Sequence, residues 1–112
     1  MVARKNYVPE RGDVIWIDFD PTRGHEQNGR RPAVVLSSKI YNKPSRLLLA
    51  CPISSRIKEY PYEVVISGVF NGAILVDHIR SLDWSARPVK KAGIVSEEIL
   101  FEIQKKLKTL LF

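Results

Sequence analysis

The sequence is poor in cysteine and contains no long apolar run. Cys51 is the single cysteine among 112 residues, and it lies within an apolar segment. A single cysteine excludes a disulfide framework within the chain and predicts a reducing, cytoplasmic setting. Its apolar surroundings favour a structural role for Cys51 over a nucleophilic one. No stretch approaches the roughly 20 apolar residues of a transmembrane helix, and residues 1–5 lead into polar residues rather than a secretion signal. We therefore expect one domain over residues 1–112 and no membrane partner.

The sequence also lacks a recognisable metal-binding cluster. Its carboxylates are scattered, and the only histidines, His25 and His78, lie far apart in the chain. Metal sites usually draw on grouped His, Cys, Asp or Glu residues at a characteristic spacing, so we expect neither a metal nor another cofactor. In contrast, 18 Lys and Arg against 12 Asp and Glu give a net charge of +6. That excess predicts a polyanionic partner.

The apolar residues occur in short runs separated by turn-forming residues, which predicts a mainly β protein. The turns are indicated by residues 42–45 (Asn-Lys-Pro-Ser), 60–61 (Tyr-Pro) and 71–72 (Asn-Gly). Several short strands between such turns favour a small antiparallel barrel or sandwich. The expected strands are 14–19, 33–37, 47–53, 63–67, 73–79 and 88–95.

The last segment of the chain follows a helical pattern instead. Ser96 can cap a helix whose first turn is acidic and whose last turns are basic, both favourable to the helix dipole. The apolar positions recur at helical spacing and form one stripe, so we expect a helix packed over the sheet. The stripe consists of Ile99, Ile103, Leu107 and Leu110.

Residues 24–33 form the most function-rich segment. They bring together His25, Glu26, Gln27, Arg30 and Arg31. Pro32 favours an extended conformation for the residue before it, so Arg31 is predicted at the entrance of a strand, where its guanidinium can leave the core. The connection over 20–31 is long for a hairpin, and long loops in compact domains are usually functional or disordered.

These residues and several later motifs make the sequence similar to the MazF/PemK family of toxin endoribonucleases. The similarity spans essentially the whole chain and implies an SH3-like antiparallel barrel with a C-terminal α-helix, usually as a homodimer. It implies the toxin of a type II toxin–antitoxin pair that cuts single-stranded RNA. The matching segments are 12–16 (Gly-Asp-Val-Ile-Trp), 20–21 (Asp-Pro), 24–33, 51–55 (Cys-Pro-Ile-Ser-Ser), 60–64 (Tyr-Pro-Tyr-Glu-Val), 77–83 (Asp-His-Ile-Arg-Ser-Leu-Asp) and 86–87 (Ala-Arg).

The resemblance and the chemistry of RNA cleavage together nominate Arg31, Ser54 and His25 as catalytic residues. Metal-free cleavage must remove a proton from the 2′-hydroxyl, deliver one to the leaving 5′ oxygen and stabilise charge on the phosphoryl oxygens. Arg31 can bind a phosphate by two hydrogen bonds, and the Ser54 hydroxyl can bond a phosphoryl oxygen, with Ser55 able to share that task. His25 titrates near neutrality and suits proton transfer, while Asp77 and Glu26 remain alternative bases.

Further residues are predicted to bind RNA outside the reacting phosphate. Cations can follow the backbone, while Tyr60 or Tyr62 offers a face for an unstacked base. Glu26 and Gln27 orient Arg31 or contact bases, two uses that the sequence does not separate. His78 stands where the family usually has glutamine, so it reads a base, titrates or replaces an amide hydrogen bond. The predicted RNA-binding residues are Glu26, Gln27, Arg30, Ser55, Arg56, Lys58, Asp77 and His78.

Two other functions remain open at this level, and the basic surface predicts one further partner. A non-catalytic CcdB-like toxin of the same fold would bind DNA gyrase, although such toxins end in a tryptophan-containing tail and this chain ends Leu110-Leu111-Phe112. A plain nucleic-acid-binding barrel is favoured only if Arg31 and Ser54 prove dispensable. The surface that attracts RNA is also expected to bind an acidic antitoxin segment that folds on contact.

Overall fold

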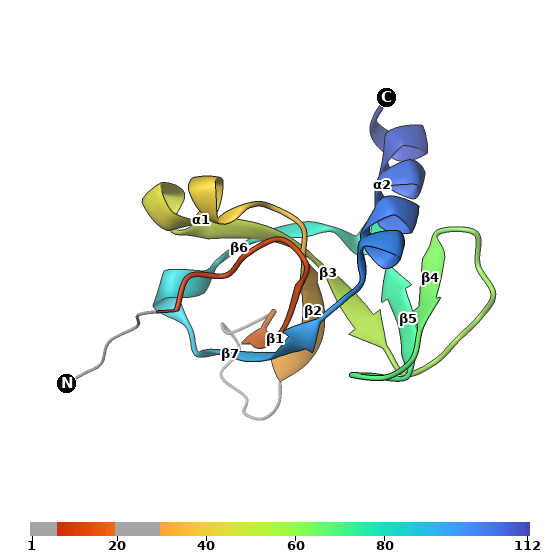
Figure 1. Ribbon diagram of the computed structural model, residues 1–112, viewed down its shortest axis with the longest axis horizontal. Helices are drawn as coiled ribbons and strands as arrows, with labels where there is room; N and C mark the ends of the chain where they lie inside the picture. The colour runs from red at the N-terminus through yellow and green to blue at the C-terminus, as the bar shows by residue number, and fades with distance from the viewer. Residues whose placement is uncertain (1–6, 20–29) are drawn as a thin grey trace.

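The computed structural model describes residues 7–19 and 30–112, and its core is an antiparallel sheet with a helix at the C-terminus (Figure 1). The described strands run antiparallel in the order β4-β5-β3-β2-β1-β7, and β6 pairs with β3 beside that path. The elements in chain order are β1 (Asp13–Asp18), β2 (Arg30–Val35), α1 (Lys39–Ser45), β3 (Leu47–Ser54), β4 (Glu63–Ile66), β5 (Gly72–Leu75), the 3-10 turn η2 (Val76–His78), β6 (Arg80–Asp83), the 3-10 turn η3 (Trp84–Ala86), β7 (Val89–Ile94) and α2 (Glu97–Leu111).

Strand β3 pairs with three other strands and connects the two parts of the sheet. Its first half pairs with β6, from Leu47 opposite Asp83 to Ala50 opposite Arg80. Its second half pairs with β2 and then with β5, where Ser54 lies opposite Ala73. The end strands of the path, β4 and β7, are not paired with each other among the described residues, so the expected barrel is an open sheet. The mainly β prediction with a C-terminal helix is confirmed.

Because side chains alternate along each strand, the apolar residues form two clusters, one on each face of the sheet. Val14, Val34 and Cys51 lie in the cluster that α2 covers, while Ile15 and Ala33 lie in the cluster on the other face. Cys51 is completely buried, and burial together with the charge of Asp77 raises the pKa of its thiol to about 12. The structural reading of Cys51 is confirmed, because a protonated, inaccessible thiol is a poor nucleophile.

Helix α2 begins where the sequence predicts. The Ser96 hydroxyl accepts a hydrogen bond from the Ile99 amide at 3.1 Å, and Ile103 is buried against the sheet. Ile99 and Leu107 pack around it, but Leu110 lies beyond the covered face and is 40% exposed. No helix in the described ranges combines the length and apolar character needed to cross a membrane.

Two local predictions are wrong. Residues 42–45 were expected to turn, but they complete α1, which the Ser38 side chain caps and the buried Asn42 amide ties to Pro9 O (2.8 Å) and Ser37 O (3.0 Å). The expected strand 73–79 divides into β5 and η2, and β6 follows as a strand that the periodicity did not indicate. Both differences arise from partners distant in the sequence, which local patterns do not report.

Candidate active site

A pocket beyond the end of β3 gathers most of the predicted site residues that the structure describes. Its volume is about 240 Å³. Its walls come from the last residue of β3, the loop after it, η2, and one residue each of β4 and β5. We call this the Ser54 pocket; it is lined by Ser54, Arg56, Lys58, Tyr60, Glu63, Leu75, Asp77 and His78.

The Ser54 hydroxyl is oriented by the loop that follows it. Its oxygen accepts a hydrogen bond from the Arg56 amide at 3.1 Å. Because a hydroxyl has one donor and two acceptor positions, its proton stays available for an oxygen of a bound ligand. Ser54 is half-buried and lines the pocket, whereas Ser55 is exposed and is not among the described residues that line it. The structure therefore distinguishes two serines that the sequence left interchangeable.

A buried carboxylate holds the basic loop between β3 and β4. Glu63 is 8% exposed, and its side chain accepts hydrogen bonds from the amides of Lys58 (3.1 Å) and Glu59 (3.1 Å). Glu59 adopts φ 61°, a left-handed conformation that is unfavourable for a residue with a Cβ atom. The loop conformation that sets Lys58 and Tyr60 around the pocket thus depends on Glu63, a residue that our sequence reasoning did not select. Glu63 lies within the matching segment 60–64, which is the signal that could have indicated it.

Tyr60 and Asp77 connect the loop to η2. The Tyr60 hydroxyl donates a hydrogen bond to Asp77 Oδ2 at 3.1 Å, and this bond to a carboxylate raises the pKa of Tyr60. Its ring meets that of Tyr62 edge-on, with centroids 6.0 Å apart. Tyr60 is the more exposed of the two rings, since Tyr62 is half-buried and its hydroxyl accepts a bond from Thr109 of α2. Of the two tyrosines, Tyr60 therefore offers the better face to a ligand.

His78 and Asp77 lie at the same wall of the pocket. The His78 Nε2 atom is 3.9 Å from Asp77 Oδ1, and the imidazole is largely exposed. Helix α2 also supports this region, because Lys106 Nζ donates a 2.7 Å hydrogen bond to Pro61 O. The loop is thus fixed from the sheet, from η2 and from α2.

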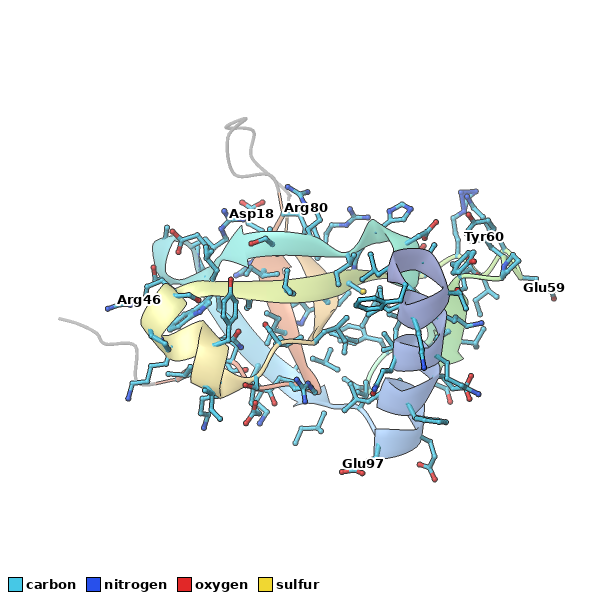
Figure 2. The ribbon with its side chains drawn as sticks, turned by 90° about the horizontal axis from the view of Figure 1, so that it is seen from above. Asp18, Arg46, Glu59, Tyr60, Arg80 and Glu97 are labelled. Atoms are coloured by element: carbon cyan, nitrogen blue, oxygen red, sulfur yellow. The ribbon has the colours of Figure 1, made fainter. Side chains whose placement is uncertain are left out.

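Arg31 belongs to a second cationic group built around Phe19. The guanidinium carbon of Arg31 lies 5.7 Å from the Phe19 ring centroid, and that of Arg80 lies 5.5 Å from it. Such distances are typical of cation–π contacts, which orient a guanidinium without neutralising it. Arg80 is a residue that the sequence analysis missed, although it lies within the motif 77–83. Figure 2 shows Arg80 beside Asp18, the last residue of β1.

The pairing register of β2 and β3, continued beyond its last recorded pair, sets Arg31 opposite Ser54. Both residues lie two positions beyond the last recorded pair of β2 and β3, which is Ala33 opposite Pro52. Opposite residues of antiparallel strands point to the same face, so continuing the register brings the two side chains to one surface. Arg31 is nevertheless not among the described residues that line the Ser54 pocket. η2 and β6 join the two groups, since His78 and Arg80 are two residues apart.

Pro32 lies where β2 is paired with β1 but not with β3. It is the third residue of a strand that is central in the sheet order. Pairing with β3 begins only at Ala33, so the missing amide proton of Pro32 breaks no recorded bond on that side. Arg30 is exposed at the start of β2. His25, Glu26 and Gln27 lie outside the described residues.

The chain is similar to known proteins over almost its whole length. Residues 10–111 match the family model described as PemK-like, MazF-like toxin of type II toxin-antitoxin system. The chain is 47% identical to the endoribonuclease toxin MazF of Escherichia coli K12, covering 99% of each, and 32% identical to the endoribonuclease PemK of Escherichia coli, covering 99% and 87%. MazF of Deinococcus radiodurans superposes with a TM-score of 0.84 at 44% identity, covering 95% and 98%. A chain of a MazE-MazF crystal structure from that organism gives 0.87 at 44% identity, covering 95% and 97%.

The Glu63 bonds generate a first prediction. Both amides bond the same oxygen of Glu63, and Glu63→Gln keeps the size of the side chain but removes its negative charge. Because bonds to a charged acceptor are stronger than bonds to a neutral one, we expect the Lys58 and Glu59 amides to exchange hydrogen about tenfold faster. NMR-detected hydrogen exchange measures this. Glu59→Gly in the same background should restore part of the protection, because glycine adopts positive φ freely. Glu59→Ala is the matched control, since it also removes the carboxylate but keeps the Cβ atom. Unchanged exchange in Glu63→Gln would contradict the assigned role.

Proposed function

The chain belongs to the PemK-like, MazF-like toxin family of type II toxin–antitoxin systems, and we propose from this premise that it is a toxin that cleaves single-stranded RNA. The observation that carries the proposal is the Ser54 pocket, where a hydroxyl and the cations Arg56 and Lys58 adjoin the Arg31 and Arg80 pair. The CcdB-like alternative is not favoured, because the relatives are named endoribonucleases.

The reaction is an internal transfer of the phosphodiester. The RNA 2′-hydroxyl oxygen forms a bond to the neighbouring phosphorus, and its proton passes to a base on the protein. The bond from phosphorus to the 5′ oxygen breaks, and that oxygen receives a proton. The products are a 2′,3′-cyclic phosphate and a 5′-hydroxyl, and the sum of atoms and charge is conserved without water, metal or redox partner.

Arg31 and Arg80 supply positive charge where the phosphoryl oxygens gain negative charge. Arg31 is exposed at the entrance of β2, and its contact with Phe19 leaves its N–H groups available for a phosphate. A guanidinium holds its proton at neutral pH, so we assign Arg31 electrostatic stabilisation through hydrogen bonds to the phosphoryl oxygens rather than the role of base. Arg80, which contacts the same Phe19 ring, adds a second positive charge to this group. This arrangement favours the transition state over the ground state.

Ser54 fixes the phosphate by a hydrogen bond. Its oxygen is already engaged by the Arg56 amide, which leaves the hydroxyl proton to donate to a phosphoryl oxygen. The same loop presents Arg56 and Lys58 to the adjoining phosphates, and Tyr60 to an unstacked base. Asp77 and His78 are proposed to contact that base or its neighbour. His25 is proposed as the proton carrier, with Glu26, Gln27, Arg30 and Ser55 contributing further RNA contacts.

Two protein partners complete the proposal. Structures of MazE-MazF from Deinococcus radiodurans contain the antitoxin of that system, and a corresponding antitoxin is expected here. A net charge of +6 favours an acidic segment that covers the same surface as RNA. We propose in addition that the toxin acts as a homodimer in the cytoplasm.

The mechanism predicts cleavage in the presence of excess EDTA. The purified protein should cut a mixed-sequence RNA under these conditions and leave a 2′,3′-cyclic phosphate and a 5′-hydroxyl, both identified by mass spectrometry. Replacing the 2′-hydroxyl by hydrogen at the cut nucleotide should abolish cleavage while leaving binding intact, because only the nucleophile is lost. Cleavage of that deoxy-substituted strand, or a strict requirement for Mg²⁺, would refute the mechanism.

The site geometry predicts an order of mutational effects. Arg31→Ala should lower kcat/KM by roughly 100-fold or more, as expected for loss of a group that stabilises transition-state charge. Ser54→Ala should lower it by about tenfold, whereas the matched control Ser55→Ala should have an effect below about twofold, because only Ser54 lines the pocket. All variants should keep the parental unfolding temperature. Parental activity in Arg31→Ala would remove the central assignment.

The role of His25 is tested by the pH dependence of cleavage. If neutral His25 accepts the 2′-hydroxyl proton, kcat/KM rises with pH around an ordinary histidine pKa of about 6.5, and His25→Gln flattens that limb while RNA affinity stays similar. If protonated His25 donates instead, the same limb falls as pH rises. The rate profile of cleavage from pH 5 to 8 distinguishes these cases. An unchanged profile and rate in His25→Gln would exclude both.

A further inference from the structure

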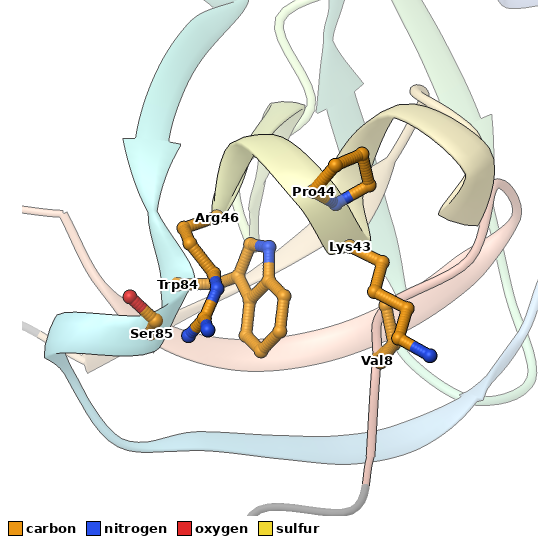
Figure 3. A pocket seen from close by; sticks show the side chains of 6 residues that line it. All are labelled: Val8, Lys43, Pro44, Arg46, Trp84 and Ser85. Atoms are coloured by element: carbon orange, nitrogen blue, oxygen red, sulfur yellow. The ribbon is translucent and has the colours of Figure 1, made fainter.

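A second hollow lies at the opposite end of β3 from the Ser54 pocket, between α1 and η3 (Figure 3). Its volume is about 530 Å³, within the range that accommodates a nucleotide-sized ligand. We call it the Arg46 hollow; its lining residues are Val8, Lys43, Pro44, Arg46, Trp84 and Ser85. The proposed cleavage reaction uses none of them.

The polar groups around the Arg46 hollow leave it with a positive rim. Lys43 and Arg46 are exposed, and neither forms an ion pair in the described part of the chain. Asp83, the acidic residue beside η3, is not among the described residues that line the hollow, and its carboxylate accepts hydrogen bonds from Ser85 N at 2.9 Å and Ser85 Oγ at 2.8 Å. The indole N–H of Trp84 is bonded to Asn42 O at 3.0 Å. The hollow therefore offers two cations to an anion.

Arg46 occupies a backbone conformation that argues for a use of its side chain. As the residue that ends α1 it has φ 66° and ψ 10°, the left-handed region where glycine is favoured. Any residue can supply the Arg46 amide that bonds Asn42 O at 3.0 Å, so this cap does not require arginine. Strained conformations often occur where the side chain has a function. Figure 3 shows Arg46 and Lys43 on either side of the Trp84 ring.

The Arg46 hollow and the Ser54 pocket lie near the two ends of β3. β3 runs from Leu47, next to Arg46, to Ser54, and its eight residues correspond to roughly 23 Å between the end residues. Figure 2 shows Arg80 between Tyr60 and Arg46 along the molecule. In that view a cation lies between the two ends of β3. About seven stacked nucleotides at 3.4 Å each would cover this distance.

We propose that Lys43 and Arg46 hold the phosphate backbone of the RNA strand at a distance from the cut, as a second contact site. The proposal rests on the proposed function, because the ligand is the same single-stranded RNA. Cations bind phosphates without regard to base sequence, so this site adds affinity and direction to the strand rather than sequence selectivity. RNA too short to extend from the Ser54 pocket to α1 does not use it.

The test compares long and short RNA with the full-length protein. The probes are single-stranded RNAs of about 20 and about 6 nucleotides around the mapped cleavage sequence, each with a 2′-deoxy substitution at the cut. Lys43→Ala/Arg46→Ala should raise Kd for the long RNA about tenfold at low salt and leave the short RNA unchanged. The slope of log Kd against log salt should fall by about 0.7 for each lost phosphate contact. Fluorescence anisotropy measures both quantities.

Three controls show whether weaker binding comes from the Arg46 site itself. They test the alternatives of lost net charge, lost stability and lost cleavage activity. Lys90→Ala/Lys108→Ala removes the same charge from exposed positions of β7 and α2, and it should not distinguish long from short RNA. Arg46→Gly should raise the unfolding temperature by about 2 °C, because glycine tolerates this backbone, and yet weaken long-RNA binding. Cleavage of unmodified short RNA by Lys43→Ala/Arg46→Ala should match the parent.

The outcomes are distinguishable. Equal Kd for long RNA in the parent and in Lys43→Ala/Arg46→Ala overturns the second site, as does an equal loss for long and short RNA. Binding of an acidic peptide that Lys43→Ala/Arg46→Ala abolishes, with long-RNA binding unchanged, would assign the hollow to a protein partner and also overturns it. A parent protein that cleaves no RNA would instead refute the proposed function.

Discussion

The pairing of β3 with three different strands is the constraint on which the arrangement of this protein depends. Its first half is held by β6 and its second half by β2 and β5, so the strand must pass from one part of the sheet to the other. The backbone of Ser54 is fixed opposite Ala73 at the point where β3 ends. A hydroxyl positioned by a buried sheet moves less than one on a free loop, which favours the phosphate contact that we propose for Ser54.

The cationic groups are positioned by two kinds of contact, an aromatic ring and internal hydrogen bonds. Arg31 and Arg80 rest on Phe19, and the loop that carries Lys58 is held through its amides by Glu63. Arginines stacked on an aromatic ring keep their hydrogen-bond donors for a ligand. In this way the fold brings several cations together on its surface, which favours the binding of an anion.

Two residues with left-handed backbones, Arg46 and Glu59, mark the ends of this charged surface. Each costs free energy that glycine would avoid, and each is stabilised by contacts from another element. The Glu63 carboxylate bonds the Glu59 amide, and Trp84 N bonds Arg46 O at 3.2 Å. The sheet thus supports conformations that short loops would not adopt in isolation.

Much of the architecture followed from local patterns in the sequence, because strand alternation and helix caps act between near neighbours. The expected strands around Val14, Val34 and Cys51 and the helix starting after Ser96 are present, and the motifs indicated Ser54, Arg56, Lys58, Asp77 and His78 as neighbours of a site. The tertiary structure alone decided that Arg80 joins Arg31, that Glu63 holds the basic loop, and that residues 39–45 form a helix. These features depend on contacts across the sheet or on buried hydrogen bonds between distant segments, and neither residue type nor spacing encodes which distant group will be the partner.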